Sequence, residues 1–328
     1  MKLLILITSF STVLSLLNDA IETQDSQLFF VYLGINEEIQ VEQLLAPIDS
    51  SFTSNDIIYY FYSKSNPTNG IKIRSYDSSA VRFTSFDNTK RTIFSIHGWK
   101  NNATSDVNNY IKDNVLKNHD VNVFVVDWGA IADKNYISAK ECVPGVGAAV
   151  ASFIKELISK YGLSLDRLTI AGHSLGAHVS GCAGKALNSQ VDTIVGLDPA
   201  GPLYSALILE NRLDKYDARF VQIIHTNAGQ LGFDGNLGDA DFYPNGGKTQ
   251  PYCNFDVTGS CSHGRSYRYY AESFNNDNFV ARKCDDYLRF ESDKCDGRTS
   301  VMGTISVDKS ATGEYYLNTL GEEPWAEG

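Results

Sequence analysis

Positive charge is scarce in this sequence relative to negative charge. It contains 28 Lys and Arg against 39 Asp and Glu, so its formal net charge at pH 7 is −11. This balance argues against a nucleic-acid partner, because binding to a phosphate backbone draws on basic patches. It also argues against long-range attraction to anionic membranes. If the protein meets lipid, apolar contacts rather than net charge must bring it there.

Pro-rich linkers, low-complexity tracts and internal repeats are missing as well. Long apolar runs are lacking after the N-terminus, where Met and Lys precede a mostly apolar stretch that ends at Leu17. We predict a signal peptide over residues 1–20 and a secreted mature chain, with a short N-terminal anchor as the alternative. Asn102 begins a clear glycosylation sequon, which fits an exported protein. The roughly 300 remaining residues suit one large domain or two small ones.

Cysteine is scarce, with six residues in the chain. In a secreted protein six cysteines suggest three disulfides, although about 15 pairings are open to them. Metal binding is the alternative, but Cys-x-x-Cys motifs and clustered Cys/His spacings are absent from the sequence. Two pairs would each close a short loop and leave a long-range third pair: Cys253–Cys261, Cys284–Cys295 and then Cys142–Cys182.

The most informative segment is Gly-His-Ser-Leu-Gly at residues 172–176. The apolar run at 168–171 is typical of a buried strand, and the small residues at 177–187 are typical of a helix. Strand, G-x-S-x-G and helix together predict a nucleophile elbow, in which Ser174 occupies a strained turn at the positive end of the helix. The pentapeptide alone would also fit an ordinary Gly/Ser turn.

Strand and helix patterns alternate along the chain, which predicts an α/β fold with a mostly parallel sheet covered on both faces. Helical spacing is clearest at 106–116 and 145–161. The segment beyond Tyr243 is rich in loop-forming residues. The predicted strands cover residues 57–62, 71–73, 92–96, 121–126, 168–171, 193–197, 220–224 and 314–319.

A serine hydroxyl becomes a good nucleophile only when a base removes its proton, and an acid must orient that base. In one widespread arrangement the acid follows the serine and the histidine comes last. Asp198 directly follows the strand at 193–197, at a carboxyl end where function concentrates. Two histidines come later. His225 fits a strand end, whereas His263 lies in a Cys-flanked loop beside Gly264, so position favours His263 and leaves His225 open.

The intermediate of acyl transfer needs two backbone N–H donors for its oxyanion. Leu175, the residue after the nucleophile, is expected to supply one. The other is expected from a loop after an earlier strand, and residues 96–99 (Ile-His-Gly-Trp) fit this requirement. The N–H of Trp99 is the candidate, with Gly98 permitting an unusual backbone. The side chain of Trp99 also suits a hydrophobic wall, and both roles can hold together.

Five segments together resemble the signatures of the animal pancreatic-lipase family, in the α/β-hydrolase superfamily: 97–99, 172–178, 196–202, 241–247 and 261–263. The resemblance runs from about residue 57 to the end of the chain and implies a single lipase-type α/β-hydrolase domain over residues 21–328. It implies the catalytic triad Ser174, Asp198 and His263, and so selects His263 over His225. It also supports the pairs Cys253–Cys261 and Cys284–Cys295, without comparable support for Cys142–Cys182.

In that family a lid lies between the cysteines that correspond to Cys253 and Cys261. Here it has only seven residues, Phe255 and Val257 among them, and a helix of that length reaches about 10 Å, too little to roof an acyl-chain cleft. Together with a short loop at 227–240, this resembles the secreted phospholipases A1. We therefore expect hydrolysis of the sn-1 ester of glycerophospholipids at a membrane or micelle surface. The alternatives are a triacylglycerol or galactolipid lipase and a non-catalytic lipid-binding or yolk-type protein.

We expect neither a cofactor nor a metal. The chain ends soon after its catalytic segments, without the C-terminal β-sandwich by which pancreatic lipase binds its protein cofactor, so a protein cofactor is not expected either. Leu209, Arg212, Asp214 and Asp217 resemble a calcium-binding loop of some family members, and oxygen ligands suit calcium. Acidic residues at such spacing more often form a solvated face, so the predicted site contains no metal.

Overall fold

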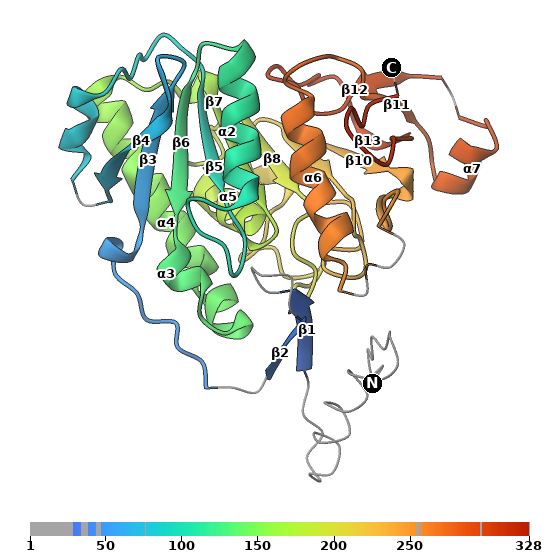
Figure 1. Cartoon of the computed structure of the whole chain (residues 1–328), viewed down its shortest axis with the longest axis horizontal. Coiled ribbons are helices and arrows are strands. Elements are labelled where there is room, and N and C mark those ends of the chain that lie inside the picture. The colour runs from blue at the N-terminus through green and yellow to red at the C-terminus, as the bar shows by residue number, and fades with distance from the viewer. Residues whose placement is uncertain are drawn as a thin grey trace.

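The computed structural model describes residues 29–33, 39–43, 47–75, 77–253, 256, 258–295 and 297–327. An 11-stranded sheet crosses the molecule, with helices in front of it and behind it (Figure 1). In sheet order the strands are β12 (Thr299–Val301), β11 (Val280–Lys283), β13 (Gly313–Leu317), β10 (Ala240–Pro244), β9 (Val221–Ile224), β8 (Thr193–Leu197), β7 (Leu168–His173), β5 (Thr92–Ile96), β6 (Asn122–Asp127), β3 (Ile58–Ser63) and β4 (Asn66–Arg74). The predicted signal peptide lies outside the described residues.

The strands from β13 to β6 in this order are parallel to their neighbours, and both edges of the sheet are antiparallel. Every residue of β5, β7 and β8 is buried, because helices cover both faces of the central strands. That is why these strands are nearly continuous apolar runs in the sequence. The α/β-hydrolase fold expected from the sequence is confirmed.

Two helix pairs cover the two faces of the sheet. Helices α2 (Asp106–Asn118) and α6 (Ser260–Glu272) pack together on one face, and α4 (Tyr136–Tyr161) and α5 (Leu175–Ala186) pack together on the other (Figure 1). Helix α4 is long and apolar enough to cross a membrane by length and composition. Its residues Val143, Val146 and Val150 are nevertheless fully buried in the main core, which assigns its apolar face to packing.

Helix α4 starts nine residues before the predicted start at residue 145. The side chain of Asn135 caps it by accepting the N–H of Ser138, which supplies a partner for one of the free donors of the first turn. The helix continues through Pro144, although proline removes one main-chain hydrogen bond. Burial of the apolar side chains of α4 in the main core, together with packing against α5, outweighs that local loss.

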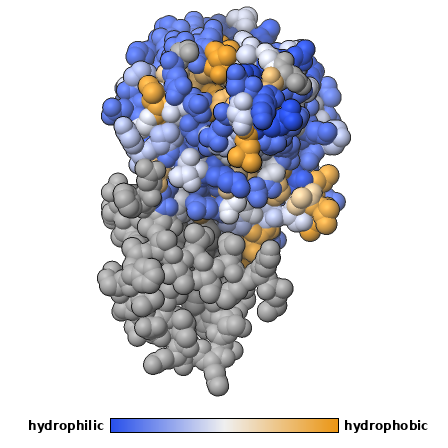
Figure 2. All heavy atoms as spheres, turned by 90° about the vertical axis from the view of Figure 1, so that its right-hand side faces the viewer, coloured by the Kyte–Doolittle hydropathy of each residue, from blue (hydrophilic) through white to orange (hydrophobic). Residues whose placement is uncertain are grey.

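The remaining elements are short. The segment beyond Tyr243 is more regular than predicted, because it contains α6, α7 (Tyr287–Glu291) and four of the strands in part or whole. The other short elements are α3 (Gly129–Ala132), the separate antiparallel pair β1 (Phe29–Leu33) and β2 (Ile39–Gln43), and the 3-10 turns η1 (Ser54–Asp56), η2 (Ser78–Phe83), η3 (Leu165–Arg167), η4 (Lys215–Asp217) and η5 (Asn245–Gly247). The face that carries the C-terminal elements is mostly hydrophilic, with apolar side chains in separate patches (Figure 2).

Two of the three predicted disulfides are confirmed, Cys253–Cys261 and Cys284–Cys295. The third prediction is wrong, because Cys142 and Cys182 are buried free thiols. Cys182 packs against Gly147 of α4, which lies about 7.5 Å further along that helix than Cys142 at roughly 1.5 Å per residue. A disulfide tolerates a Cα–Cα distance of only about 4.4–6.8 Å, so the offset between the two helices keeps the thiols apart.

Candidate active site

Ser174 lies between β7 and α5, in the strained turn that the pentapeptide predicted. Its backbone has φ 57° and ψ −125°, a region that side-chain-bearing residues rarely adopt and that costs of order 1–3 kcal/mol. Leu197 at the end of β8 holds this turn by accepting the N–H of Ser174 at 3.1 Å. The residue is half-buried, so its hydroxyl remains accessible at the head of the helix.

The two glycines of the pentapeptide permit the close packing of this turn. A Cβ on Gly172 would lie 2.1 Å from the carbonyl oxygen of Gly176, and a Cβ on Gly176 would lie 2.4 Å from that of His97. Both distances are far below van der Waals contact with main-chain atoms that cannot withdraw. The strand, the turn and the helix therefore approach one another only because these positions lack side chains.

Asp198 is fully buried at the carboxyl end of β8 and has φ 43°. Its Oδ1 accepts the main-chain N–H groups of Thr226 at 2.8 Å and Asn227 at 3.0 Å. These two donors follow β9, the neighbouring parallel strand, so they meet Asp198 at the same edge of the sheet. The sequence analysis did not predict these two donors. The signal that could have found them is their position directly after β9, the strand that follows β8 in the chain. They fix the carboxylate in one orientation.

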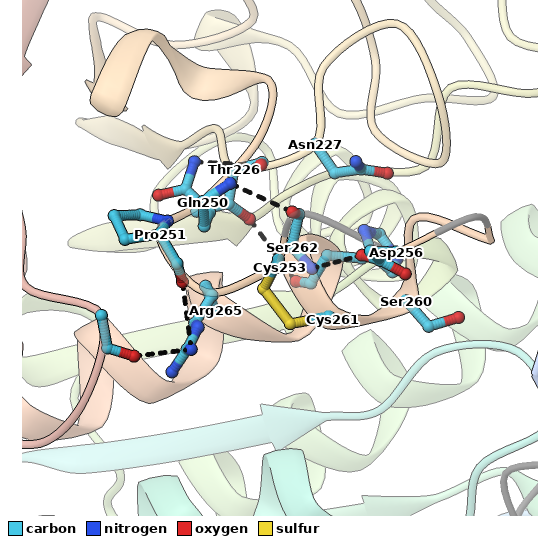
Figure 3. The surroundings of a disulfide bond; sticks show 12 residues. Thr226, Asn227, Gln250, Pro251, Cys253, Asp256, Ser260, Cys261, Ser262 and Arg265 are labelled. Atoms are coloured by element: carbon cyan, nitrogen blue, oxygen red, sulfur yellow. Dashed lines mark hydrogen bonds between the residues drawn. A yellow bond between two sulfur atoms is a disulfide. The ribbon is translucent and has the colours of Figure 1, made fainter.

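The other oxygen of this carboxylate, Oδ2, lies 2.5 Å from Nδ1 of His263. The histidine is on the first turn of α6 rather than in the loop predicted for it. The disulfide Cys253–Cys261 joins this turn to the preceding segment, and the N–H of Gln250 donates to Oγ of Ser262 at 3.1 Å (Figure 3). A helix turn held in this way orients the imidazole more firmly than a free loop would.

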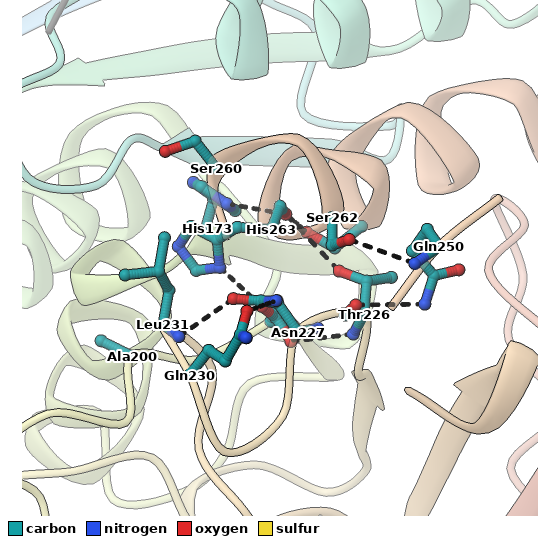
Figure 4. A network of polar contacts seen from close by, with 12 residues as sticks. His173, Ala200, Thr226, Asn227, Gln230, Leu231, Gln250, Ser260, Ser262 and His263 are labelled. Atoms are coloured by element: carbon teal, nitrogen blue, oxygen red, sulfur yellow. Dashed lines mark hydrogen bonds and ion pairs between the residues drawn. The ribbon is translucent and has the colours of Figure 1, made fainter. Parts of the chain in front are cut away.

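His173 connects the nucleophile turn to the histidine. It precedes Ser174, and its ring centroid lies 4.3 Å from that of His263, so the two imidazoles are side by side above Thr226 and Asn227 (Figure 4). Burial, with the charge of His263 as a second cause, holds the pKa of His173 well below its ordinary value. His173 therefore stays neutral, and its ring does not compete with His263 for a proton.

The loop after β5 packs directly against the nucleophile. A Cβ on Gly98 would lie 2.8 Å from the Cβ of Ser174, so only glycine lets this loop reach the serine. Trp128 holds the loop, since its Nε1 donates to the carbonyl oxygen of His97 at 2.8 Å and its N–H donates to Nε2 of the same residue at 3.2 Å. This anchor went unnoticed in the sequence. The loop thus brings Gly98, the residue before Trp99, into contact with Ser174.

Leu175 is the first residue of α5 and is fully buried. Main-chain N–H groups in the first turn of a helix lack partners within the helix and carry its positive dipole end. Such a group directly after the nucleophile suits an anionic oxygen bound to Ser174. The assignment of Leu175 and Trp99 as the two donors stays a prediction.

The residues that resemble a calcium loop do not fit a metal ion. Nζ of Lys185 donates to the carbonyl oxygen of Arg212 at 2.7 Å and to Oδ2 of Asp217 at 2.7 Å. Asp214 is engaged as well, because its Oδ2 accepts from Nη1 of Arg212 at 3.3 Å. Side-chain cations of the protein thus already neutralise these oxygens. Calcium would have to displace the ammonium of Lys185 to use them.

Two predicted features are not decided by the structure. Phe255 and Val257 of the lid lie outside the described residues. Asn102 is exposed, and its Oδ1 accepts the N–H of Thr104 at 2.9 Å, so the sequon lies in an accessible turn before α2. Glycosylation of Asn102 stays a prediction.

Comparison with known proteins places these features in a family. The family model described as Lipase matches residues 33–325. Pancreatic triacylglycerol lipase of Sus scrofa is 35% identical over 263 residues, which cover 73% of this chain and 58% of that protein. Pancreatic lipase-related protein 3 of Homo sapiens is 36% identical over 305 residues, which cover 82% of this chain and 64% of that protein.

A third relative, described as inactive pancreatic lipase-related protein 1 of Canis lupus familiaris, is 35% identical over 297 residues, with 80% of this chain and 62% of that protein covered. The chain thus spans about three fifths of the length of these relatives. The family model matches nearly all of the described residues, and the elbow, the buried acid and the histidine lie within the match. The chain belongs to the lipase family.

Proposed function

We propose that this protein is a secreted serine hydrolase of lipid carboxylic esters. The observation that carries the proposal is the 2.5 Å contact between Nδ1 of His263 and Oδ2 of Asp198, beside a serine held in a strained, half-buried turn. A histidine that donates to a fixed carboxylate keeps its other nitrogen free to act as a base. Membership of the lipase family supports the substrate class.

In the proposed reaction, Nε2 of His263 takes the proton of Ser174 as Oγ attacks the ester carbonyl. The N–H groups of Leu175 and Trp99 bind the oxyanion, and the imidazolium then protonates the leaving alcohol. An acyl-serine remains, which water hydrolyses after giving its proton to His263. Asp198 orients the imidazole throughout and stabilises its positive charge.

Triacylglycerol is the substrate that the comparisons favour, since the relative of Sus scrofa is described as a pancreatic triacylglycerol lipase. The other two relatives named above are described as pancreatic lipase-related proteins, one of them as inactive. The seven-residue lid and the short loop at 227–240 favour phospholipase A1. The comparisons support the triacylglycerol alternative better, so we propose triacylglycerol as the main substrate and phospholipid as the second candidate.

The test is hydrolysis by the secreted protein of trioleoylglycerol and, in parallel, of phosphatidylcholine with different acyl chains at sn-1 and sn-2. The Ser174→Ala variant is the blank. We expect release chiefly from triacylglycerol, and release of only the sn-1 chain of phosphatidylcholine would instead establish phospholipase A1. Absence of fluorophosphonate labelling of Ser174 in the folded protein would favour a non-catalytic lipid-binding protein.

A further inference from the structure

Large exposed apolar side chains gather in one loop of the described chain, between β8 and η4. Leu207 is 91% exposed, Ile208 57% and Leu209 40%, and Leu203 nearby is 54% exposed. We call Leu207, Ile208 and Leu209 the apolar tip. Residues 199–209 contain no charged side chain, although the chain as a whole carries a net charge of −11. Exposed apolar clusters of this kind mark interaction sites.

Arg212 holds the apolar tip in its outward position. Its side chain is almost fully buried, and Nε and Nη2 donate to the carbonyl oxygens of Ser205 and Ala206 at 3.0 Å each. The N–H of Arg212 also donates to the carbonyl oxygen of Leu209 at 3.4 Å. Both ends of the tip are therefore bound to one buried arginine, so the three side chains cannot fold back without breaking this clamp.

The base of the same loop belongs to the rim of the candidate active site. Oη of Tyr136 donates to the carbonyl oxygen of Pro202 at 3.0 Å, and the ring of Tyr136 packs edge-on against that of Trp99 at 5.2 Å. The N–H of Gly201 donates to the carbonyl oxygen of Leu231, in the loop that also contacts Asp198. Leu203 and the tip therefore belong to a loop whose first residues contact the surroundings of Trp99 and Asp198.

We propose that Leu203 and the apolar tip insert into the surface of an uncharged or zwitterionic lipid aggregate and so hold the active site against its substrate. This inference rests on the proposed function, because it assigns the surface that meets the lipid. The stretch at 199–209 carries no charge that anionic headgroups could attract, and the exposed Glu210 that follows it and the net negative charge of the protein oppose them. Apolar side chains on a fixed turn gain by leaving water for acyl chains.

The experiment measures binding of the Ser174→Ala protein to phosphatidylcholine vesicles by co-flotation, with and without the added changes Leu207→Ser and Ile208→Ser. Without hydrolysis, the readout reports binding alone. We expect the two changes to weaken vesicle binding about tenfold or more, since burial of one leucine-sized side chain is worth at least that factor. Added phosphatidylglycerol or high salt is expected to leave the binding of the parent protein unchanged or to shift it by less than that factor.

Leu288→Ser is the matched control. Leu288 is 74% exposed in α7, a helix on the side of the molecule that carries the C-terminal elements (Figure 1). We expect this change to leave vesicle binding intact. Three results would each overturn the proposal. The tip variant could bind vesicles as well as its parent, the control Leu288→Ser could lose as much vesicle binding as the tip variant, or high salt could abolish vesicle binding of the parent. Concentration-dependent dimerisation of the parent that the tip variant lacks would also overturn it, because the occupant would then be a second copy.

Hydrolysis of a soluble short-chain ester separates this proposal from the proposed function. The tip variant with Ser174 intact should hydrolyse p-nitrophenyl butyrate at the parental rate while losing activity on emulsified trioleoylglycerol. Vesicle binding through the tip without any Ser174-dependent hydrolysis would overturn the proposed function and leave the lipid-binding surface standing. Hydrolysis of both substrates by the tip variant at parental rates would overturn the proposed lipid-binding role of the tip and leave the proposed function standing.

Discussion

His225 and Asp241 form a second buried histidine–carboxylate pair, with 2.9 Å between Nε2 and Oδ1. Both side chains are shielded from solvent, and the N–H groups of Leu237 and Gly238 donate to the same carboxylate. The pair closes the loop at 227–240 from both ends. His225 is therefore engaged in holding this loop, and it precedes Thr226, which binds Asp198.

Replacement of this carboxylate is expected to lower both stability and activity. In Asp241→Asn one oxygen becomes an NH₂ group that faces a main-chain donor, so a buried N–H loses its acceptor at a cost of about 2 kcal/mol. Urea unfolding measures the loss. Asp234→Asn removes an exposed carboxylate from the same loop and should change the free energy of unfolding by less than about 0.5 kcal/mol. Equal effects of the two changes would contradict the role given to the pair.

Backbone strain at Ser174 predicts an unusual order of stabilities. Ser174→Gly relieves the strained φ of 57°, whereas Ser174→Ala retains it. Allowing for the greater freedom of glycine in the unfolded chain, we expect Ser174→Gly to be more stable than Ser174→Ala by about 1 kcal/mol. Thermal unfolding of the two variants checks this, and neither should hydrolyse esters. A more stable alanine variant would show that the turn is not strained.

Gly232 packs against Asp198, the predicted catalytic acid. A Cβ at this residue would lie 2.5 Å from Oδ1 and 2.7 Å from Oδ2 of Asp198. The carboxylate is held by Thr226, Asn227 and His263, so it can only withdraw by breaking these hydrogen bonds. We expect Gly232→Ala to lower kcat about 100-fold, as a misplacement near 1 Å does, while the far-UV circular dichroism stays native. Activity within a few-fold of the parent would sink this assignment.

His178 makes the stability of the fold depend on pH. Burial lowers its pKa to about 3, and its Nδ1 accepts the N–H of Leu213 at 3.0 Å while Nε2 donates to the carbonyl oxygen of Ala200 at 2.8 Å. Both nitrogens are thus engaged in the neutral form. The unfolded chain takes up this proton near the ordinary pKa of 6.5, so the contribution to stability is complete above that pH and is lost progressively down to about pH 3.

The His178→Gln variant measures this contribution. We expect the variant to be less stable than the parent at pH 7. Between pH 7 and pH 5, however, its free energy of unfolding should fall by about 2 kcal/mol less than that of the parent, because one proton changes this free energy by about 1.4 kcal/mol per pH unit. Asp217 acts in the opposite direction, because burial raises its pKa to about 6 and the folded protein takes up that proton first as the pH falls. Because the parent and His178→Gln both contain Asp217, this contribution cancels in the difference between their free energies of unfolding. Parallel pH profiles of the two free energies would refute the assignment.

Lys185 provides the positive charge that the loop at 209–217 needs. We expect chelators to leave the melting temperature unchanged and Lys185→Ala to cost about 2 kcal/mol at neutral pH, because the carboxylate of Asp217, 2% exposed, loses its partner. Lys160→Ala removes an ion pair with Glu156 in which the lysine side chain is 54% exposed, and should cost less than about 0.5 kcal/mol. A fall in melting temperature on chelation would show that a metal ion binds after all.

Local patterns in the sequence were enough to predict the central strands and the strained turn at Ser174. The strands at 92–96 and 193–197 coincide with β5 and β8, because burial on both faces makes such strands continuous in apolar residues. Ser174 and its glycines follow from the tight turn between strand and helix. The two disulfides that close short loops could be predicted as well, because cysteines that are close in the sequence are also close in space whatever the fold.

Only the tertiary structure decided the contacts between distant segments. Asp241, on β10, pairs with His225, and the packing of α4 on α5 leaves Cys142 and Cys182 as free thiols. The donors that fix Asp198 come from the end of the adjacent strand, and the helix that carries His263 is held by a disulfide at its first turn. The physical reason is the same throughout: residue type and spacing determine local conformation and burial, whereas the pairing of side chains depends on which strands and helices become neighbours.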